Sequence, residues 1–473
     1  MEETTKKGRR LPLMRDIDLT EGTIWKKLLL FAVPILLTNI LQQLFNTVDT
    51  AIVGAYESST ALAAVGSVGS LVSLVVGFFM GVSSGSGVIV SRHWGALLSE
   101  RAKEKPDERA LREDERSVNA AVHTAFIVAL VMGAIVTLLG MTLSPVLLEL
   151  INSPDSVRPL SLLYLRIYFA GMIPMMFYNT AAGILRGIGD SNRPLIYLII
   201  AGGSNVILDF IAVAILKWSV AGAAIATLAS NLISTVLALI RLMGSKEAYR
   251  LRLSDLRVEK NMLIGIIKIG IPTGIQSSMY AISNLLIQSN YNKFGEDAMA
   301  GVAAFGTIDG FLYMPINAFG LAEMTFAGQN FGAGKPERVH KAVVSGLAMV
   351  MSFDILLAII VQFISPPLVS SFTQGNAEAI RYAVMMMHIL PPTYFIFAPT
   401  EILGGVIRGA GSALQTMLLT AFFICVIRVV IVTVFMPFFS DIRLVFAAYP
   451  ISWLLCSAAF FVYYRFGHWR KEI

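Results

Sequence analysis

The sequence has little charge, few cysteines and few histidines. Only 14% of its 473 residues are charged, whereas a soluble chain of this length would carry far more charge on its surface. Both cysteines, Cys425 and Cys456, lie in apolar segments, which indicates buried thiols rather than a disulfide framework. The histidines are scattered without the spacing of metal ligands, and no nucleophile–base pair accompanies them. We therefore expect neither an enzyme nor a cofactor.

Long apolar runs dominate instead: 56% of the residues are hydrophobic and the mean hydropathy is +0.70. Many runs reach the roughly 20 residues that span a bilayer as a helix. None alternates with the period of a barrel strand. We predict an all-α polytopic membrane protein with twelve transmembrane helices. The predicted spans are 28–54, 61–90, 119–143, 159–185, 194–216, 220–240, 262–292, 298–327, 342–364, 379–407, 413–436 and 444–464.

The net charge is +6, and the basic residues behind it are distributed unequally between the two sides of the predicted topology. When the loops are assigned alternately to two sides, one side receives both termini, the 92–116 loop and the 241–260 linker, all rich in lysine and arginine. The other side receives only Arg158, Lys217, Lys293 and Arg443. The positive-inside rule then places both termini in the cytoplasm. We expect the chain in the plasma membrane. The basic residues indicate orientation in a lipid bilayer, not nucleic-acid binding.

Two further segments at this side have simple interpretations. The polar segment 1–27 is not followed by a small-residue cleavage site, so we expect no cleaved signal peptide. Acids and bases nearly balance in the run 101–116, which predicts a solvated cytoplasmic loop or a short helix.

The chain contains an internal repeat. Four pairs of segments match in the same order: 32–46 with 270–284, 61–69 with 298–306, 91–96 with 328–333, and 183–191 with 405–413. A parallel repeat of six helices relates the two halves by an axis along the membrane normal, which is typical of secondary transporters with a substrate site between the halves. No segment has the pattern of a channel selectivity filter.

The repeat predicts two pseudo-symmetric six-helix lobes. We predict a cytoplasmic segment 1–27, an N-lobe 28–240, a cytoplasmic linker 241–261, a C-lobe 262–464 and a cytoplasmic tail 465–473.

Polar residues on the first predicted helix form a stripe: Thr38, Gln42, Asn46 and Asp49 fall within an arc of about 80° at about 100° per residue. A carboxylate at mid-membrane costs about 2.5–3.5 kcal/mol on insertion scales, so the stripe is expected to face protein or water. A structural hydrogen bond between helices would also explain Asp49.

A second intramembrane acid lies in the same half. Asn205 and Asp209 are one helical turn apart, and Thr227 is the polar member of a small-residue segment, 221–230. Two carboxylates, an amide oxygen and a hydroxyl can hold Na⁺ or share a proton. We therefore predict a coupling-cation site formed by Asp49, Asn205, Asp209 and Thr227, with the choice between Na⁺ and H⁺ left open.

The second half differs, since Ile287 and Ile431 occupy the positions equivalent to Asp49 and Asp209. Among its own acids, Glu401 precedes a repeated Arg-Gly-x-Gly turn by about two helical turns. It is therefore expected inside the bilayer, where it could meet a cationic cargo. The predicted substrate pocket comprises Gln42, Asn46, Asn179, Gln276, Tyr280 and Glu401. Pro34, which lies early in the first helix, is predicted to be a hinge.

Several motifs resemble the multidrug and toxic compound extrusion (MATE) transporters. They are Pro34 with "VDTAIVG" (48–54), "GQNFGAGK" (328–335), and the paired turns "RGIGDS" (186–191) and "RGAGSA" (408–413). The resemblance implies two six-helix lobes and export of small organic, often cationic, compounds in exchange for Na⁺ or H⁺ by alternating access. We expect a monomer.

The resemblance extends to individual residues. Asp49, Asn205, Asp209 and Thr227 match the N-lobe cation set of prokaryotic members, and Pro34 matches a kinking proline. The glutamate that one branch of the family has on helix 7 is absent here.

A lipid-linked oligosaccharide flippase of the same superfamily is the alternative function. A protein that handles pyrophosphate lipids is expected to place several arginines or lysines in its central cavity. Arg166, Arg381 and Arg428 are the only arginines assigned to the predicted spans, and the intramembrane acids fit a cationic cargo better.

Overall fold

The computed structural model describes residues 16–373, 375–439 and 441–472, and these residues form helices and turns without a strand. The all-α prediction is confirmed. The first half contains α1 (Ile24–Tyr56), α2 (Ser59–Arg101), α3 (Glu108–Leu150), α4 (Arg158–Ala170), α5 (Met172–Gly187), α6 (Asn192–Asp209) and α7 (Ser219–Met243). The second half contains α8 (Lys260–Tyr291), α9 (Glu296–Gly332), α10 (Pro336–Ser370), α11 (Ala377–Ile389), α12 (Tyr394–Gly409), α13 (Ala413–Thr420), α14 (Arg428–Phe439) and α15 (Ile442–Phe466).

Within the described residues, ten helices are long and apolar enough to cross a membrane, and the bent pair α4–α5 raises the number to eleven. The two members of this pair meet at 48°. The remaining predicted span, 379–407, is occupied by α11 and α12 with a short 3₁₀ turn, Pro391–Thr393, between them. The chain is therefore a multi-pass membrane protein whose helices agree with the twelve-helix prediction.

Two spans contain π-helical segments. Phe210–Ile215 continues α6, and Ala421–Ile427 connects α13 to α14. Such segments are rare in proteins and occur often at functional sites. Each one adjoins a charged residue, Asp209 in the first half and Arg428 in the second.

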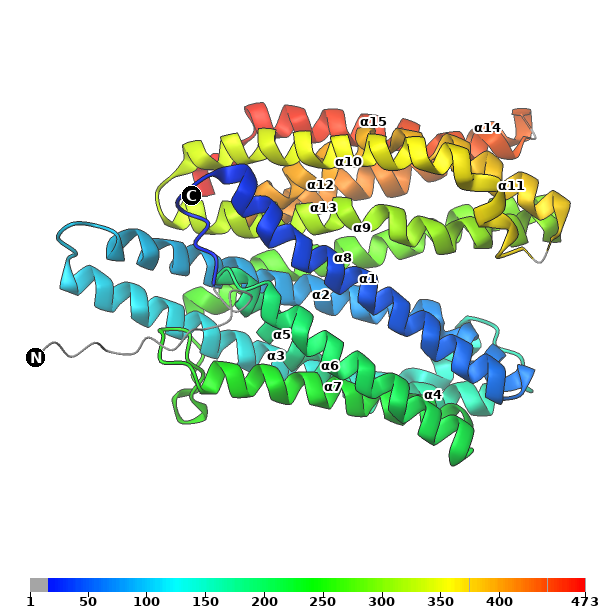
Figure 1. Ribbon diagram of the computed structural model, residues 1–473, viewed down its shortest axis with the longest axis horizontal. Coiled ribbons are helices and arrows are strands. Elements are labelled where there is room, and N and C mark those ends of the chain that lie inside the picture. The colour runs from blue at the N-terminus through cyan, green and yellow to red at the C-terminus, as the bar shows by residue number, and fades with distance from the viewer. Residues whose placement is uncertain (1–15, 374, 440, 473) are drawn as a thin grey trace, which may run out of the picture.

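The charged run 101–116 is mostly helical. Helices α2 and α3 leave only residues 102–107 as a turn, so the helical alternative of the prediction applies to most of the run. Local signals explain this: the Asp107 side chain caps α3 by accepting from the Arg109 amide at 2.9 Å, and Glu108 pairs with Arg112 at 2.9 Å. The resulting hairpin projects beyond the other helices (Figure 1).

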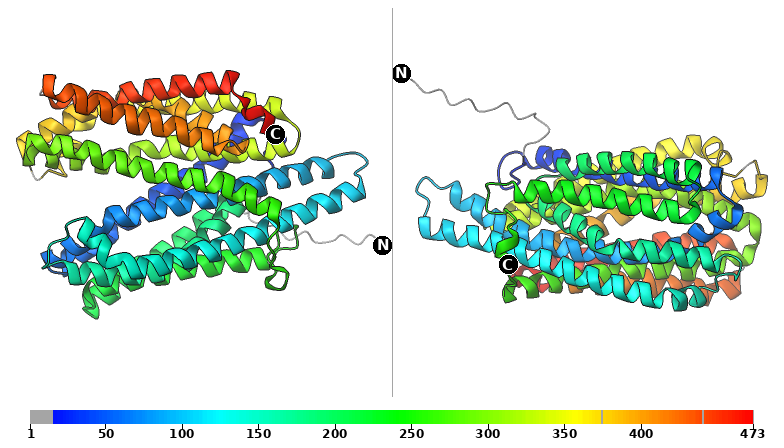
Figure 2. Two further views of the ribbon diagram at one scale, coloured as in Figure 1. Left: turned by 180° about the vertical axis from the view of Figure 1, so that it is seen from behind. Right: turned by 90° about the horizontal axis from the view of Figure 1, so that it is seen from below.

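We call α1–α7 the N-lobe and α8–α15 the C-lobe. Most helices of each lobe lie together, on opposite sides of the molecule in Figure 1 and Figure 2. Helix α1 crosses from the α10 side to the α4 side and packs against both α9 and α6. Helix α8 makes the reciprocal connection, since it packs along α2 and α13. Helices α1 and α2 of the N-lobe and α8 and α9 of the C-lobe therefore meet at the interface.

The end of the bundle where α1 begins and α15 ends is called the terminal end (Figure 1). Here α2 and α9 touch through a pair of repeated glycines. A Cβ at Gly95 would overlap the carbonyl oxygen of Gln329, and a Cβ at Gly332 would overlap that of Arg92. These residues are repeat partners, so the contact is two-fold symmetric. The Gln329 side chain also donates to the Gly187 carbonyl at 2.8 Å.

Residues 16–22, which precede α1, form a strap across the same end. The Ile17 amide donates to the carbonyl of Gly189 in the N-lobe at 2.9 Å. The Asn330 side chain of the C-lobe donates to the Leu19 carbonyl at 3.1 Å, and Leu19 is fully buried. The strap thus bonds to both lobes and holds them together at the terminal end.

An ion pair anchors the beginning of this strap. Arg193 lies 2.9 Å from Asp16 and also pairs with Asp190, which sits in the turn between α5 and α6. Burial raises the pKa of the Asp190 carboxyl, while the Arg193 guanidinium opposes that shift.

Candidate functional site

The N-lobe contains a pair of acids, of which Asp209 is buried and Asp49 is partly buried. Asp49 of α1 and Asp209, the last residue of α6, are close enough for their carboxyl groups to interact. The Asn205 amide donates to Asp209 Oδ2 at 3.0 Å, as the one-turn spacing suggests. Among the described residues, Oδ1 of each acid is buried without a hydrogen-bond partner. The structure therefore brings together three of the four residues predicted for the coupling cation.

Thr227 is hydrogen-bonded within its own helix rather than to this acid pair. Its hydroxyl donates to the Ala223 carbonyl at 3.0 Å, as is common for threonine inside a helix. It lines a small cavity with Tyr168, Met172 and Asn231. In the described part of the chain, no hydrogen bond joins Thr227 to either acid, so the hydroxyl is not a ligand in this conformation.

The sequence analysis missed Tyr164 of α4. Its phenol is close enough to Asp49 and Asp209 to interact with both charges, and its ring stacks on Tyr168 with 6.1 Å between centroids and 17° between planes. A phenol can donate to a carboxylate or accept from a protonated one. A lone tyrosine in an apolar helix carries no motif, so only the packing of α4 against its neighbours reveals it.

The donor set of the acid pair fits a hard cation or a proton. The described residues contain no group of three histidines, cysteines or acids that could hold a metal ion. Two carboxylates and one amide oxygen are suitable for Na⁺, while the carboxylates alone are sufficient for H⁺.

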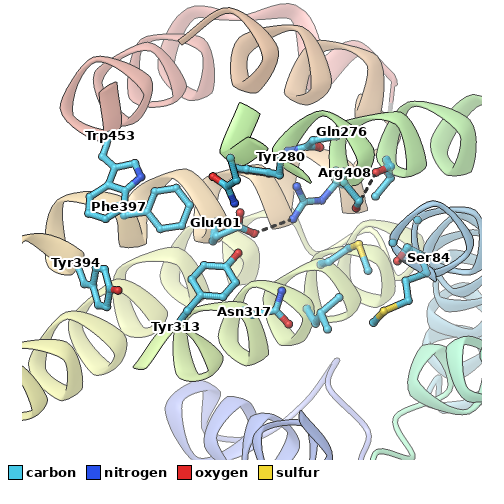
Figure 3. Close-up of a pocket in the computed structure, with 18 of the residues that line it drawn as sticks. Ser84, Gln276, Tyr280, Tyr313, Asn317, Tyr394, Phe397, Glu401, Arg408 and Trp453 are labelled. Atoms are coloured by element: carbon cyan, nitrogen blue, oxygen red, sulfur yellow. Dashed lines mark hydrogen bonds and ion pairs between the residues drawn. The ribbon is translucent and has the colours of Figure 1, made fainter. Parts of the chain in front are cut away.

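A cavity of about 400 Å³ is lined mostly by C-lobe residues, and we call it the C-lobe cavity (Figure 3). Helix α2 of the N-lobe completes its wall with Gly77, Met80, Gly81 and Ser84. Helix α8 contributes Gln276 and Tyr280, and α12 contributes Glu401. These are three of the six residues predicted for the substrate pocket. Its aromatic lining comprises Tyr280, Tyr313, Tyr394, Phe397, Tyr449 and Trp453. The cavity can therefore bury a flat apolar molecule.

Glu401 is already paired. Its Oε2 lies 3.5 Å from Nη2 of Arg408, and both side chains are buried (Figure 3). The sequence analysis placed Arg408 just beyond a predicted span, whereas the structure places it within α12 and in the wall of the cavity. Arg408 therefore competes with any cationic cargo for the Glu401 carboxylate. The repeated Arg-Gly-x-Gly motif was the available signal for this arginine.

Asp309 and Arg428 also line the C-lobe cavity, so its wall holds two acids and two arginines. A neighbouring cavity of about 530 Å³ shares Asp309 with it and is lined by both lobes, for example by Leu71 of α2 and Met386 of α11. The space between the lobes is thus closed at the terminal end and hollow farther along the bundle.

The other predicted pocket residues belong to the N-lobe. Gln42 and Asn179 line a cavity of about 60 Å³ together with Arg186, the repeat partner of Arg408. This small cavity adjoins the C-lobe cavity, since both are lined by Met80, Ser84 and Leu321.

Two remaining predicted residues lie on α1. Asn46 is exposed on this helix and lines neither of those two cavities. Helix α1 continues through Pro34, whose carbonyl accepts from the Thr38 hydroxyl at 2.7 Å. The hinge role of Pro34 remains a prediction.

A repeated helical bundle in a membrane, with a cavity between its lobes and an acid pair in one of them, has the architecture of a secondary transporter. The MatE family model matches residues 34–105, 112–211 and 272–434. The chain therefore belongs to the MatE family.

Relatives and solved structures agree with this assignment. The "Probable multidrug resistance protein YpnP" of Bacillus subtilis is 28% identical over 457 residues, covering 97% of this chain and 98% of the relative. The "Probable multidrug resistance protein YoeA" of the same organism is 26% identical, with 96% of each chain covered. A solved outward-facing multidrug resistance MATE transporter of the MOP superfamily superposes with a TM-score of 0.87 at 21% identity, covering 95% of this chain and 97% of that one.

Proposed function

We propose that the protein exports small organic compounds in exchange for Na⁺ or H⁺ by alternating access. The observation that carries this proposal is the acid pair, Asp49 and Asp209, neither of which lines the C-lobe cavity. The Bacillus relatives are described as multidrug resistance proteins, which supports organic compounds as the cargo. Residues Gln42, Asn179, Gln276 and Tyr280 are proposed cargo contacts.

The acid pair supplies a switch. Two adjacent carboxylates repel one another in a medium of low dielectric, and a bound Na⁺ or proton removes that repulsion. Coupling requires only that the cation and the cargo favour different conformations of the lobes. The terminal end carries most of the basic residues and is proposed to face the cytoplasm. With that end closed by the strap and the two glycines, the structure corresponds to an outward-facing state.

Two assays test this function. Expression in an efflux-deficient bacterium is expected to raise tolerance to ethidium, and proteoliposomes are expected to move ethidium when a gradient of Na⁺ or pH is imposed. Failure of both gradients to drive movement, with protein correctly inserted, would refute the antiport mechanism. A response to one gradient alone identifies the coupling ion.

The flippase alternative is favoured by one observation. The structure adds Arg408 to Arg428 in the wall of the central cavity, so this cavity holds more arginine than the predicted spans suggested. Rescue of a strain lacking its cell-wall lipid flippase, without any gain in ethidium tolerance, would support this alternative over drug export.

A further inference from the structure

Arg428 is a buried cation without a counter-charge. It follows the π-helical segment Ala421–Ile427, is 3% exposed and lines the C-lobe cavity. Its Nε donates to Ser452 Oγ at 3.0 Å, and its guanidinium carbon lies 4.2 Å from the ring centroid of Tyr449. Among the described residues, no carboxylate forms an ion pair with Arg428 and no hydrogen bond engages its two terminal nitrogens.

A comparison with Arg408 shows that Arg428 lacks a carboxylate partner. Arg408 lines the same cavity but has Glu401 as its partner at 3.5 Å. A buried charge without a partner is strongly unfavourable, and a hydroxyl with one aromatic face compensates for only part of the lost hydration. The two free terminal nitrogens of Arg428 form a planar fork that matches the two oxygens of a carboxylate.

The surroundings indicate what kind of molecule would bring that carboxylate. Tyr280 lies near Arg428 and, with Phe397 and Trp453, lines the same cavity, so a planar ring system can be buried beside the guanidinium. The repeat partner of Arg428 is Val206, so the N-lobe has no equivalent cation at this position.

We propose that the C-lobe cavity binds aromatic cargo that carries a carboxylate, and that Arg428 pairs with this carboxylate. This inference deepens the proposed function, and it rests on that function only in treating the bound molecule as a transported cargo. Arg428 is then a specificity residue: it separates anionic aromatic compounds from neutral compounds of the same shape.

The test uses three probes that share one ring system: naphthoate, naphthalenemethanol and naphthylmethylamine. Isothermal titration calorimetry on the purified full-length protein in detergent measures each dissociation constant. The unaltered protein is expected to bind naphthoate about 10- to 100-fold more tightly than naphthalenemethanol, the range of a charge-assisted hydrogen bond. Arg428→Gln is expected to abolish this preference and to leave binding of naphthalenemethanol unchanged.

Two variants control for chemistry and position. Arg428→Lys retains a charge but loses the planar fork, so a reduced preference is expected to remain. Arg381→Gln removes an exposed arginine of the same lobe, which pairs with Glu378 at 3.2 Å, and is expected to leave all three dissociation constants unchanged.

Clear outcomes would overturn the proposal. Equal affinity of the unaltered protein for naphthoate and naphthalenemethanol would do so, as would an undiminished preference in Arg428→Gln. If Arg428→Gln fails to fold, the lysine variant decides, because an unchanged preference there contradicts pairing through the fork. Binding in detergent needs no gradient, so a naphthoate preference without ethidium export would refute only the transport mechanism. Export without the preference would refute only the role of Arg428.

Discussion

The two lobes share a scaffold but have opposite charges at related places. In the N-lobe, Asp209 directly precedes the π-helical segment Phe210–Ile215. In the C-lobe, Arg428 directly follows the π-helical segment Ala421–Ile427 in the corresponding span. The N-lobe contains the acid pair, whereas the C-lobe contributes two arginines, Arg408 and Arg428, to the wall of the cavity of about 400 Å³.

This difference between the lobes indicates which part of a duplicated fold must stay symmetric. Gly95 and Gly332 make equivalent contacts across the interface, because closure of the lobes needs both backbones to approach equally. The polar positions inside each lobe do not take part in closure and can diverge. We infer that ion binding is confined to the N-lobe, whereas cargo is bound between the lobes with most of its contacts on the C-lobe.

The largest effect is expected from removing the acid pair. Asp49→Asn and Asp209→Asn each remove a titratable group that the proposed switch requires, so ethidium export driven by either gradient is expected to be abolished. Transport in proteoliposomes measures this, and ethidium binding in detergent is expected to persist.

Asp354→Asn is the matched control. Asp354 is a buried acid of α10, 2% exposed, whose two carboxylate oxygens have no partner among the described residues, and it lines none of the cavities described above. Export by this variant at the unaltered rate, with loss in both N-lobe variants, would localise coupling to the N-lobe. Export by Asp49→Asn at the unaltered rate would remove the distinction between the lobes.

The next largest effect concerns the symmetric contact. Gly95→Val and Gly332→Val each place atoms where a carbonyl oxygen of the opposite lobe lies, so the terminal end is expected not to close. Export is expected to fall about tenfold or more, in line with the cost of overpacking a tight interface. Labelling of a cysteine introduced at this end measures the opening directly.

Gly69→Val in the same helix α2 is the control, since no atom lies within 4 Å of a Cβ there. Equal and large effects at residues 95 and 332 would support the symmetric closure. A strong effect at one position only would show that the two lobes do not contribute equally to the gate.

Much of this fold was predictable from the sequence, because bilayer thickness fixes helix length and the repeat fixes the topology. The acid pair was predictable too, since a membrane carboxylate needs a polar partner and Asn205 sits one turn from Asp209. The ion pair of Glu401 with Arg408 was not predictable, because Arg408 lies near the end of the predicted span. The position of Tyr164 near the two acids depends on how α4 packs, and the absence of a hydrogen bond from Thr227 to those acids depends on how α7 packs. Hydropathy encodes neither.

A smaller effect distinguishes the two acids of the C-lobe cavity. Glu401 is neutralised by Arg408, whereas Oδ1 of Asp309 has no partner among the described residues. Asp309→Asn is therefore expected to weaken ethidium binding about tenfold, the range of one charge-assisted contact, and Glu401→Gln to weaken it less. Calorimetry in detergent measures the dissociation constant of ethidium for each variant. A larger loss in Glu401→Gln would mean that cargo displaces Arg408 from its partner.

The smallest effects are expected from two residues other than the acids themselves, Tyr164 and Thr227, whose contributions to ion affinity can be compared. The Tyr164 phenol is near both acids, so Tyr164→Phe removes a group that can bond to the cation-free carboxylates. Loss of one such hydrogen bond changes ion affinity by about 2- to 10-fold. Thr227 bonds to its own helix, and Thr227→Ala is expected to change ion affinity by no more than about twofold. The concentration of Na⁺ or H⁺ that half-activates ethidium export measures both. If Thr227→Ala removes an Na⁺ response while a pH response survives, the hydroxyl must turn toward Asp209 in another conformation, and the N-lobe would bind the two ions with different ligand sets.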